Sequence, residues 1–253
     1  MIIIKTAEEL KFLRKIFLEE KKDVGFVPTM GALHNGHRSL FQKSAIENDV
    51  TIVSIYVNKT QFNERSDYEN YPVEIEKDVQ FLEQSDVDIL FLPSYEIIYA
   101  DNYNFRVNEY SFSKTLCGKS REGHFEGVLT VVMKLLNIVN PKRAYFGEKD
   151  YQQYLLIKNM CKSFFLDVEI IGCPIVRESD GLAMSSRNLL LTKNERKIAL
   201  HFYKIISQNY TIAKTEEELE MLGFKVDYIE DVESRRFGAV YLGKVRLIDN
   251  VKL

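Results

Sequence analysis

The chain of 253 residues has no tryptophan, only five prolines and only three cysteines. Cys117, Cys161 and Cys173 form no CxxC pair, so neither a zinc ribbon nor a dithiol redox site is predicted. Cys161 and Cys173 have apolar neighbours and are expected to be reduced core thiols in a reducing compartment. No apolar run approaches the roughly 18 residues of a membrane span, and the isoleucines after Met1 are too few for a signal peptide. We therefore expect a soluble, cytoplasmic protein without a membrane partner.

Neither sign of charge dominates the sequence. Its 34 Lys and Arg residues nearly balance 37 Asp and Glu residues, which gives a net charge of −3. Because no long basic run stands out, no nucleic-acid partner is expected. Hydrophobic residues make up 45% and charged residues 28%, which is typical of a globular protein and excludes a disordered charged chain.

The first two-thirds of the chain alternate short apolar stretches with helical patterns. Strands are expected at 24–28, 50–57, 88–92, 144–146 and 168–172, and helices at 6–22, 36–47, 75–83, 126–139 and 150–162. The stretch Val50–Val57 is almost entirely apolar or β-branched, as strands buried on both faces of a parallel sheet are. The alternation predicts an α/β fold with a doubly wound parallel sheet.

The pattern changes after Val176. One helix is expected at the capping box Thr192–Glu195, and a second, short and acidic, after Thr215. Strands are expected at 225–229, 239–242 and 244–248. The sequence therefore predicts a first domain over residues 1–176 and a smaller α+β lobe over residues 177–253, with no linker rich in Pro, Gly or Ser between them.

The segment Pro28–His37 lies between a predicted strand and a predicted helix. In open α/β sheets ligands bind at the carboxyl ends of strands, and a helix N-terminus favours an anion. His34 and His37, three residues apart, can point the same way and donate N–H groups to a phosphate. The alternative is a polar turn with two surface histidines. A metal site is less favoured because no third ligand has a suitable spacing.

Three other polar segments follow predicted strands or join the two domains. Gly147–Gln153 offers a lysine for phosphate, Arg177–Asn188 offers Ser185, Ser186 and Arg187, and Asn58–Asn63 offers amides toward the same crevice. Each segment can also be explained without a ligand. The first would be an ordinary helix start, the second a serine-rich surface loop, and the third a loop that is polar because it is exposed to solvent. Since Met184–Arg187 lies beyond the boundary at Val176, we expect this loop to reach a nucleotide only when the small lobe closes.

Six separated segments together resemble the pantothenate synthetase (pantoate–β-alanine ligase) family. They are PTMGALHNGH, VNKTQFN, EGHFEGVLTVVMKL, FGEKDYQQ, RESDGLAMSSRN and RLIDN, in that family's order. The resemblance implies a Rossmann-like lobe with a smaller C-terminal lobe, a homodimer and kinship with the HIGH/KMSKS nucleotidyltransferases. The sequence departs from the family pattern at Lys59 and Glu122, where proline is usual, and at Val73, where arginine is usual.

The resemblance also implies an activity, ATP-dependent condensation of (R)-pantoate with β-alanine. The acid would be activated as a pantoyl adenylate with release of pyrophosphate, and the amine would then displace AMP. ATP would enter with Mg²⁺ as a co-substrate, and neither a prosthetic group nor a protein-bound metal is implied. The partners would be these small molecules.

Residue roles follow from the resemblance. Catalysis is assigned to His34, His37 and Lys149, with His37 as proton donor. Gln61, Gln153 and Asn58 are assigned to substrate, with Gln61 also beside the β-alanine site. ATP binding is assigned to Met30, Gly31, Ala32, Leu33, His34, Asn35, Gly36, His37, Gly147, Glu148, Lys149, Asp150, Val176, Met184, Ser185, Ser186 and Arg187.

Two other functions stay open from the residues alone. One is a different adenylate-forming or nucleotidyl-transferring enzyme on the same scaffold, which would share the histidines and Lys149 but not the pair Gln61 and Gln153 in one pocket. The other is a non-catalytic protein that binds a nucleotide or RNA.

Overall fold

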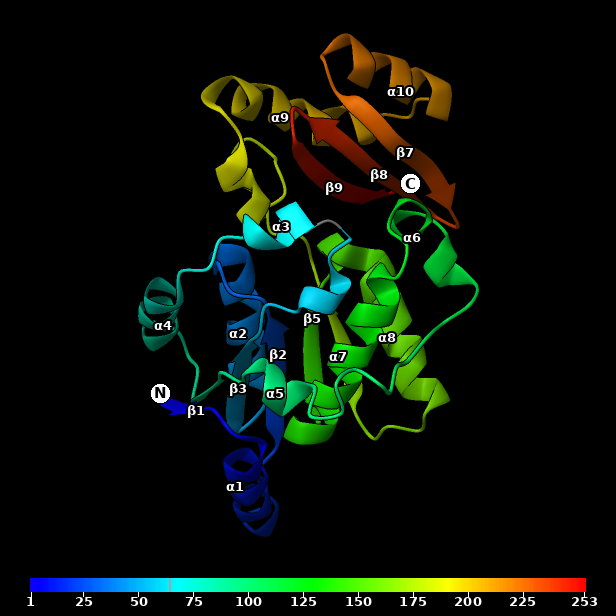
Figure 1. Cartoon of the computed structure of the whole chain (residues 1–253). Coiled ribbons are helices and arrows are strands. Elements are labelled where there is room, and N and C mark those ends of the chain that lie inside the picture. Colours follow the sequence, from blue (N-terminus) through cyan, green and yellow to red (C-terminus); the bar gives the residue numbers. More distant parts are fainter. Residues whose placement is uncertain (64) are drawn as a thin grey trace.

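A six-stranded parallel sheet forms the centre of the computed structural model, which describes residues 1–63 and 65–253 (Figure 1). The strand order is β1-β4-β3-β2-β5-β6, and every neighbouring pair is parallel. The strands are β1 (Ile2–Ile4), β2 (Val24–Thr29), β3 (Val50–Ile55), β4 (Ile89–Phe91), β5 (Arg143–Gly147) and β6 (Glu169–Cys173). The doubly wound α/β fold predicted from the sequence is confirmed.

Within the described residues, eight α-helices accompany the sheet. They are α1 (Ala7–Glu19), α2 (Asn35–Glu47), α3 (Arg65–Glu69), α4 (Ile75–Glu83), α5 (Tyr95–Ile98), α6 (Cys117–Ser120), α7 (His124–Val139) and α8 (Tyr151–Ser163). Short 3-10 turns are η1 (Lys59–Gln61), η2 (Phe112–Lys114) and η3 (Glu148–Asp150). The expected capping box is present, since the Thr6 side chain accepts from the Glu9 N–H and Glu9 reaches back. Helix α1 nevertheless ends three residues before the predicted Lys22.

Strand β1 was not predicted. Its three isoleucines pair with Ile89–Phe91 at the edge of the sheet. Only Ile4 is buried, while Ile2 and Ile3 are exposed. Three residues with no alternation give no strand period, so only the tertiary pairing defines this strand.

The chain reverses its direction of travel across the sheet between β2 and β5. From β2 it moves outward through β3 to β4, then returns and continues from β5 to β6 on the other side. Such a reversal point leaves a crevice outside the carboxyl ends of the two adjacent strands, where ligands bind in open α/β sheets. The fold alone therefore places a binding site after Thr29 and Gly147.

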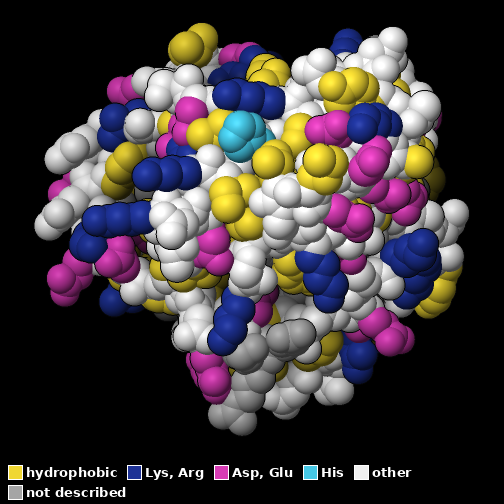
Figure 2. Space-filling view, turned by 90° about the horizontal axis from the view of Figure 1, so that it is seen from above, with side chains coloured by type: hydrophobic (Ala, Val, Ile, Leu, Met, Phe, Trp, Pro, Cys, Tyr) yellow, Lys and Arg dark blue, Asp and Glu magenta, His cyan; other side chains and the backbone are white. Residues whose placement is uncertain are grey.

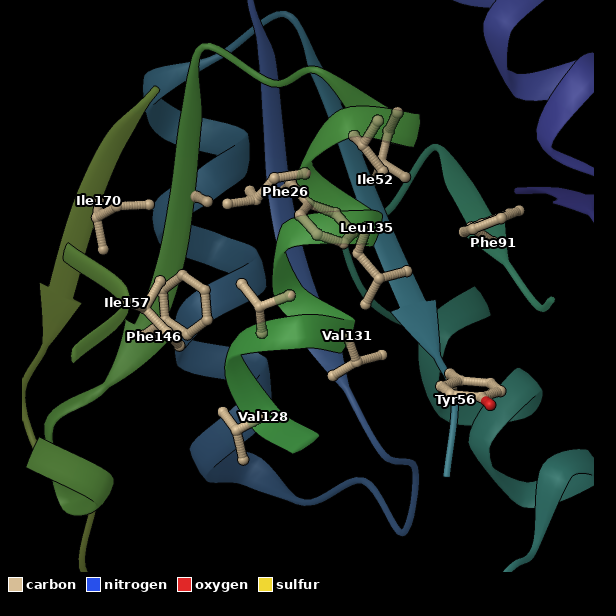
Figure 3. Close-up of a cluster of buried hydrophobic side chains, with 14 of the residues drawn as sticks. Phe26, Ile52, Tyr56, Phe91, Val128, Val131, Leu135, Phe146, Ile157 and Ile170 are labelled. Carbon is tan, nitrogen blue, oxygen red and sulfur yellow. The ribbon is translucent and has the colours of Figure 1, made fainter. Parts of the chain in front are cut away.

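Two layers of helices cover the sheet. On one face, Val128, Val131 and Leu135 of α7 lie against the sheet side chains Phe26 and Phe146 (Figure 3). On the other face, α2 and α4 pack on the sheet through a second apolar cluster, formed by Leu40, Phe41, Leu82, Val27, Val53 and Leu90. Because α7 is buried around most of its circumference, it is a core helix as well as the inner wall of the crevice.

The small lobe has its own antiparallel sheet, in the order β7-β8-β9, and its own apolar cluster. Its elements are η4 (Ser186–Leu190), α9 (Lys193–Ile206), α10 (Ile212–Met221), β7 (Lys225–Val232), β8 (Arg235–Leu242) and β9 (Val245–Lys252). In Figure 1 the lobe lies over the upper end of the parallel sheet. Seen from above, its face mixes Lys and Arg with Asp and Glu (Figure 2), and no broad patch of one charge stands out on it.

The start of α10 was predicted too late. The N-cap is Thr211, whose side chain accepts from the Lys214 N–H, and the helix begins at Ile212. Thr215 is buried inside the helix and donates its hydroxyl to the Thr211 carbonyl at 3.0 Å. Threonine is a favoured N-cap residue, so from the sequence alone either Thr211 or Thr215 could precede the helix. Thr215 is buried inside the helix, and Thr211 is the cap. The expected strands are present but longer, particularly β8, which begins at Arg235.

Other predictions from composition can be compared directly. All three cysteines are buried and free. None of the helices in the described ranges combines the length and apolar character needed to cross a membrane.

An ion pair with a buried carboxylate anchors the start of the small lobe. The guanidinium of Arg177 makes two contacts with the carboxylate of Asp249 on β9, at 2.6 and 3.0 Å. The same guanidinium donates to the Gly181 carbonyl at 3.1 Å and stacks 3.6 Å from the centre of the Tyr203 ring. The Asp249 side chain is 1% exposed, and the guanidinium of Arg177 is the cation that it contacts.

We expect Arg177→Met to lower the free energy of unfolding by about 3–5 kcal/mol, because it leaves the Asp249 carboxylate buried without a cation. Urea unfolding followed by circular dichroism measures the change. The matched control is Lys142→Ala, which removes a surface ion pair with Asp23 and should cost less than about 1 kcal/mol. Equal losses in the two variants would contradict this role of Arg177.

Candidate active site

A cavity of about 240 Å³ lies at the reversal point of the sheet, between the carboxyl ends of the strands and the small lobe. It brings together most of the residues to which the sequence analysis assigned a role. These are Met30, His34, Gly36, His37, Asn58, Gln61, Gly147, Lys149, Asp150, Gln153, Val176, Met184, Ser185, Ser186 and Arg187. Segments separated by more than 150 residues therefore share one cavity, as the motifs predicted.

Five of the predicted ATP-binding residues do not line this cavity, namely Gly31, Ala32, Leu33, Asn35 and Glu148. Three of them form the turn after β2, where Gly31 and Ala32 have φ angles of +81° and +50°. The backbone N–H groups of Ala32 and Leu33 donate to the carboxylate of Asp78 at 2.9 and 2.8 Å. These three residues thus shape the loop that carries the histidines.

Asp78 is a residue that the sequence analysis missed. It lies on α4 and is buried, and burial raises the pKa of its carboxyl group although the two N–H donors oppose that shift. In the sequence, Asp78 is only one acidic residue in the helix predicted at 75–83. Acidic residues are common on the polar face of such a helix, so its role could not be recognised there. Its partners are 45 and 46 residues away along the chain, so no local pattern could reveal them.

His34 and His37 lie side by side at the start of α2, with ring centres 4.1 Å apart. The Nδ1 atom of His34 accepts from the Gly36 N–H at 3.1 Å, and the Nδ1 atom of His37 accepts from the His34 N–H at 3.2 Å. In the neutral rings the proton is therefore on Nε2. Both rings present an Nε2–H donor and leave no Nδ1 proton to donate.

Burial keeps both rings neutral at physiological pH. It lowers the pKa of His34 to about 4, with a further contribution from Lys149. Burial, the neighbouring His34 and Lys149 lower the pKa of His37 to about 3. The cavity thus holds two uncharged imidazole donors beside the positive Lys149, an arrangement that favours a phosphate.

The GEKD turn after β5 is held by the last strand of the small lobe. The side-chain amide of Asn250 donates to the carbonyls of Glu148 and Lys149 at 2.9 and 3.0 Å. Asn250 is buried and was mentioned in the sequence analysis only as part of the RLIDN segment. The Lys149 ammonium lies 3.8 Å from the Asp150 carboxylate.

Asn58, just before η1, and Gln61, its last residue, differ in how many of their amide groups are free to contact a ligand. Asn58 is buried, and its Nδ2 donates to the Gln61 side chain and to the Gly127 carbonyl, each at 3.1 Å. Its Oδ1 accepts from the Thr60 and Tyr99 hydroxyls at 3.0 and 2.8 Å. Every donor and acceptor of the Asn58 amide is therefore used, and its contacts orient Gln61.

Gln153 and its neighbour Gln152 point to different surroundings. Gln153 lines the main cavity. Gln152 is buried, accepts from the Cys117 N–H at 3.0 Å and donates to the carbonyls of Phe112 and Thr115 at 2.8 Å. Gln152 therefore anchors the segment before α6, and only Gln153 is free to contact a molecule in the main cavity.

The loop Met184–Arg187 already lies at the cavity wall. That it reaches a nucleotide only when the small lobe closes stays a prediction. Ser185 caps η4 by accepting from the Arg187 N–H at 3.3 Å, and the Arg187 guanidinium pairs with Asp67 of α3 at 3.0 Å. The ion pair ties this loop to α3 of the sheet domain.

The apolar wall of the cavity comes from α7. Val128, Val131, Val132 and Leu135 belong to the core cluster. They also line the cavity beneath Gln61. The site therefore joins polar groups from loops to an apolar floor, as small-molecule sites generally do.

The rest of the described chain offers two further observations. A larger hollow of about 790 Å³ lies beside the cavity, borders it at Tyr56 and contains none of the predicted site residues. Across residues 1–63 and 65–253, no three His, Cys, Asp or Glu side chains are grouped so that they could hold a metal ion.

Comparison with known proteins extends this description. The family model for pantoate–β-alanine ligase matches residues 2–252. The chain is 54% identical over 230 residues to the pantothenate synthetase of Legionella pneumophila (strain Lens), with 91% of each protein covered. It is 49% identical over 251 residues to the pantothenate synthetase of Bdellovibrio bacteriovorus, with 99% of each covered.

Solved structures agree. The crystal structure of pantoate–β-alanine ligase from Francisella tularensis, complexed with β-γ ATP and β-alanine, has a TM-score of 0.95 and 46% identity, covering 100% of this chain and 97% of that one. The enzyme from Thermus thermophilus has a TM-score of 0.90 and 38% identity, covering 100% and 99%. With its sequence and its fold both matched over nearly the whole length, the chain belongs to the pantoate–β-alanine ligase family.

Proposed function

We propose that this chain catalyses the ATP-dependent condensation of (R)-pantoate with β-alanine through a pantoyl adenylate. The observation that carries the proposal is a single cavity that contains the two histidines, Lys149, the Ser185–Arg187 loop and the pair Gln61 and Gln153. Family membership supports the same reaction. The histidines, Lys149 and the Ser185–Arg187 loop suit a triphosphate, and the glutamines suit a hydroxy acid.

In the first step the pantoate carboxylate attacks the α-phosphorus of ATP, and pyrophosphate leaves. Negative charge grows on the phosphate oxygens, and fixed donors that need no rearrangement stabilise it best. The Nε2–H groups of His34 and His37 and the Lys149 ammonium are such donors. Since burial and the nearby positive Lys149 lower its pKa to about 3, His37 acts here as a hydrogen-bond donor. The proton-donor role implied by the resemblance stays a prediction.

Pantoate has two hydroxyl groups and a pair of methyl groups beside its carboxylate. Gln61 and Gln153 can bond the hydroxyls and the carboxylate, while the α7 residues Val131 and Leu135 offer an apolar surface to the methyl groups. Asn58 holds Gln61 in place through its own satisfied contacts. These contacts orient the pantoate carboxylate toward the α-phosphorus of ATP.

In the second step the amine of β-alanine attacks the acyl carbon of the adenylate, a C–N bond forms, and the C–O bond to AMP breaks. The amine loses a proton as the amide forms, and AMP leaves with the bonding electrons as an anion, with the negative charge on its phosphate group. No enzyme nucleophile is needed, so the protein contributes orientation and charge stabilisation. Mg²⁺ would enter with ATP and bind through phosphate oxygens.

Two other features belong to the proposal: a homodimer, which the family resemblance implies, and a cytoplasmic location, which was expected from the cysteines and the apolar pattern of the sequence. The competing functions are a ligase or nucleotidyltransferase that activates another acid, and a nucleotide- or RNA-binding protein without turnover. The presence of Gln61 and Gln153 in the same cavity as His34 and Lys149 favours the pantoate reaction.

Exchange of labelled pyrophosphate into ATP tests the function. We expect exchange with pantoate and without β-alanine, and AMP release only when both substrates are present. Exchange that depends on a different acid would identify another adenylating enzyme. ADP as product, or exchange that strictly needs the amine, would exclude the two-step adenylate reaction.

Loss of a fixed donor should slow adenylation. We expect His34→Ala, His37→Ala and Lys149→Ala each to lower the single-turnover rate about a hundredfold, or about 3 kcal/mol, because each donor faces charge that grows in the transition state. Gln153→Ala is the contrast variant and should raise the KM for pantoate while ATP affinity stays close to wild type. Near wild-type rates in all three donor variants would refute their assignment.

Arg187 offers a test of the second loop. Arg187→Lys keeps the charge but loses the planar fork, so we expect slower adenylation and more AMP released per pantothenate formed, since the adenylate is less well shielded from water. Product ratios and single-turnover rates measure both effects, and thermal unfolding checks the fold. Wild-type values in both measurements would show that the loop is not a phosphate clamp.

A further inference from the structure

The turn that carries Lys149 is not fixed by a cap from its own segment. This turn, η3, joins β5 to α8. Gly147, which precedes η3, has no side chain, and within the described ranges the side chain of Asp150, which precedes α8, makes no capping hydrogen bond. Such caps usually fix the backbone where a helix begins. The direction in which Lys149 leaves the turn is therefore set by contacts from other segments.

The most direct of these contacts comes from Asn250 of β9, which is 2% exposed. Its Nδ2 donates to the carbonyls of Glu148 and Lys149, at 2.9 and 3.0 Å. Its Oδ1 accepts from the guanidinium of Arg235 on β8, so every polar group of this amide has a partner. The two carbonyls belong to the peptide units on either side of the Lys149 Cα. Because peptide units are planar, holding both of them fixes the direction of the Lys149 side chain.

Strand β8 of the small lobe holds the same turn at its two ends. The guanidinium of Arg235 lies 3.9 Å from the centre of the Tyr151 ring and 3.8 Å from the Glu148 carboxylate. Phe237, two residues further along β8, packs beside Tyr151 with ring centres 6.0 Å apart. Glu148 and Tyr151 flank Lys149 along the chain. The backbone around Lys149 is therefore attached to the small lobe, although its residue number places it in the sheet domain.

The histidine donors are held by the other domain. Asp78 of α4 accepts from two backbone N–H groups of the loop before His34, and the Nδ1 atoms of His34 and His37 accept from N–H groups within the same loop. All of these residues belong to the sheet domain. The cavity therefore takes its histidines from one domain and receives Lys149 on a turn that the other domain holds. The position of the small lobe on the sheet domain sets how Lys149 faces the two rings.

We propose that Asn250 is a positioning residue through which the docked small lobe fixes Lys149 opposite the two histidines and thereby sets the rate of adenylation. The inference rests on the proposed function, in which Lys149 donates to the phosphate oxygens of ATP. Asn250 does not line the main cavity, so it contacts neither ATP nor pantoate there. Its effect on the reaction must therefore pass through Lys149.

Asn250→Asp tests this role with little change of shape. The carboxylate can still accept from Arg235, but it cannot donate to the carbonyls of Glu148 and Lys149. We expect the single-turnover rate of adenylation to fall about tenfold or more, because a small displacement of a group that acts in the transition state is costly. Thermal unfolding checks that the variant is folded.

Asn48→Asp is a control matched in its hydrogen bonds. The Nδ2 of Asn48 also donates two bonds, to the Ser44 carbonyl at 2.8 Å and the Tyr145 hydroxyl at 2.7 Å, and its Oδ1 accepts from Arg143 at 3.2 Å. Asn48 follows α2 and Arg143 begins β5, so this amide lies at the opposite end of β5 from the Lys149 turn. The control removes the same two donors and should leave the adenylation rate close to wild type.

A double-mutant cycle with Lys149→Ala separates positioning from a general loss of stability. Asn250→Asp should slow adenylation when Lys149 is present and have no further effect in Lys149→Ala, because the group that it positions is then gone. Asn48→Asp should have the same small effect in both backgrounds. Asn250→Ser, which is uncharged and can donate only one hydrogen bond, takes the place of the aspartate variant if that variant does not fold.

An unchanged rate in Asn250→Asp, an equal loss in Asn48→Asp, or the same fold-loss with and without Lys149 would overturn the role of Asn250. Absence of pantoate-dependent pyrophosphate exchange in the wild type would instead overturn the proposed function, so the two failures are distinguishable.

Discussion

The carboxyl ends of the adjacent strands β2 and β5 are the constraint on which the site depends. In a parallel sheet the carboxyl ends of all strands lie on the same side. After β2 the chain continues toward one outer strand of the sheet, and after β5 it continues toward the other. The histidine loop and the Lys149 turn are therefore neighbours although more than 100 residues separate them. The small lobe adds the third segment from above (Figure 1).

Buried hydrogen bonds then fix the orientation of the side chains that the fold brings together. Asp78 holds the turn before His34 through two backbone N–H groups, and each histidine has its Nδ1 atom occupied by an N–H of the loop. Asn58 holds Gln61 in the same way. These donors and acceptors belong to the protein itself, so the groups left facing the cavity are oriented before any ligand arrives.

The sequence predicted the parts that are encoded locally. Apolar β-branched runs such as Val50–Ile55 and the capping boxes of α1 and α9 identify elements because their signals lie within a few residues. The motif residues could be assigned to one crevice because each follows a strand. Asp78 and β1 could not be recognised, because their significance depends on partners that are distant along the chain. The start of α10 was misplaced because burial, which a single sequence does not show, chose between two threonines.

The hydrogen bonds of Asn250 to the carbonyls of Glu148 and Lys149 also bear on the order in which the protein matures. During synthesis, β9 leaves the ribosome after every other element described here. The parallel sheet, whose strands all precede Pro174, can pair and bury its core before that moment. The turn that carries Lys149 gains its final support only when residue 250 has docked. A nascent chain can therefore acquire its sheet well before it acquires a completed active site.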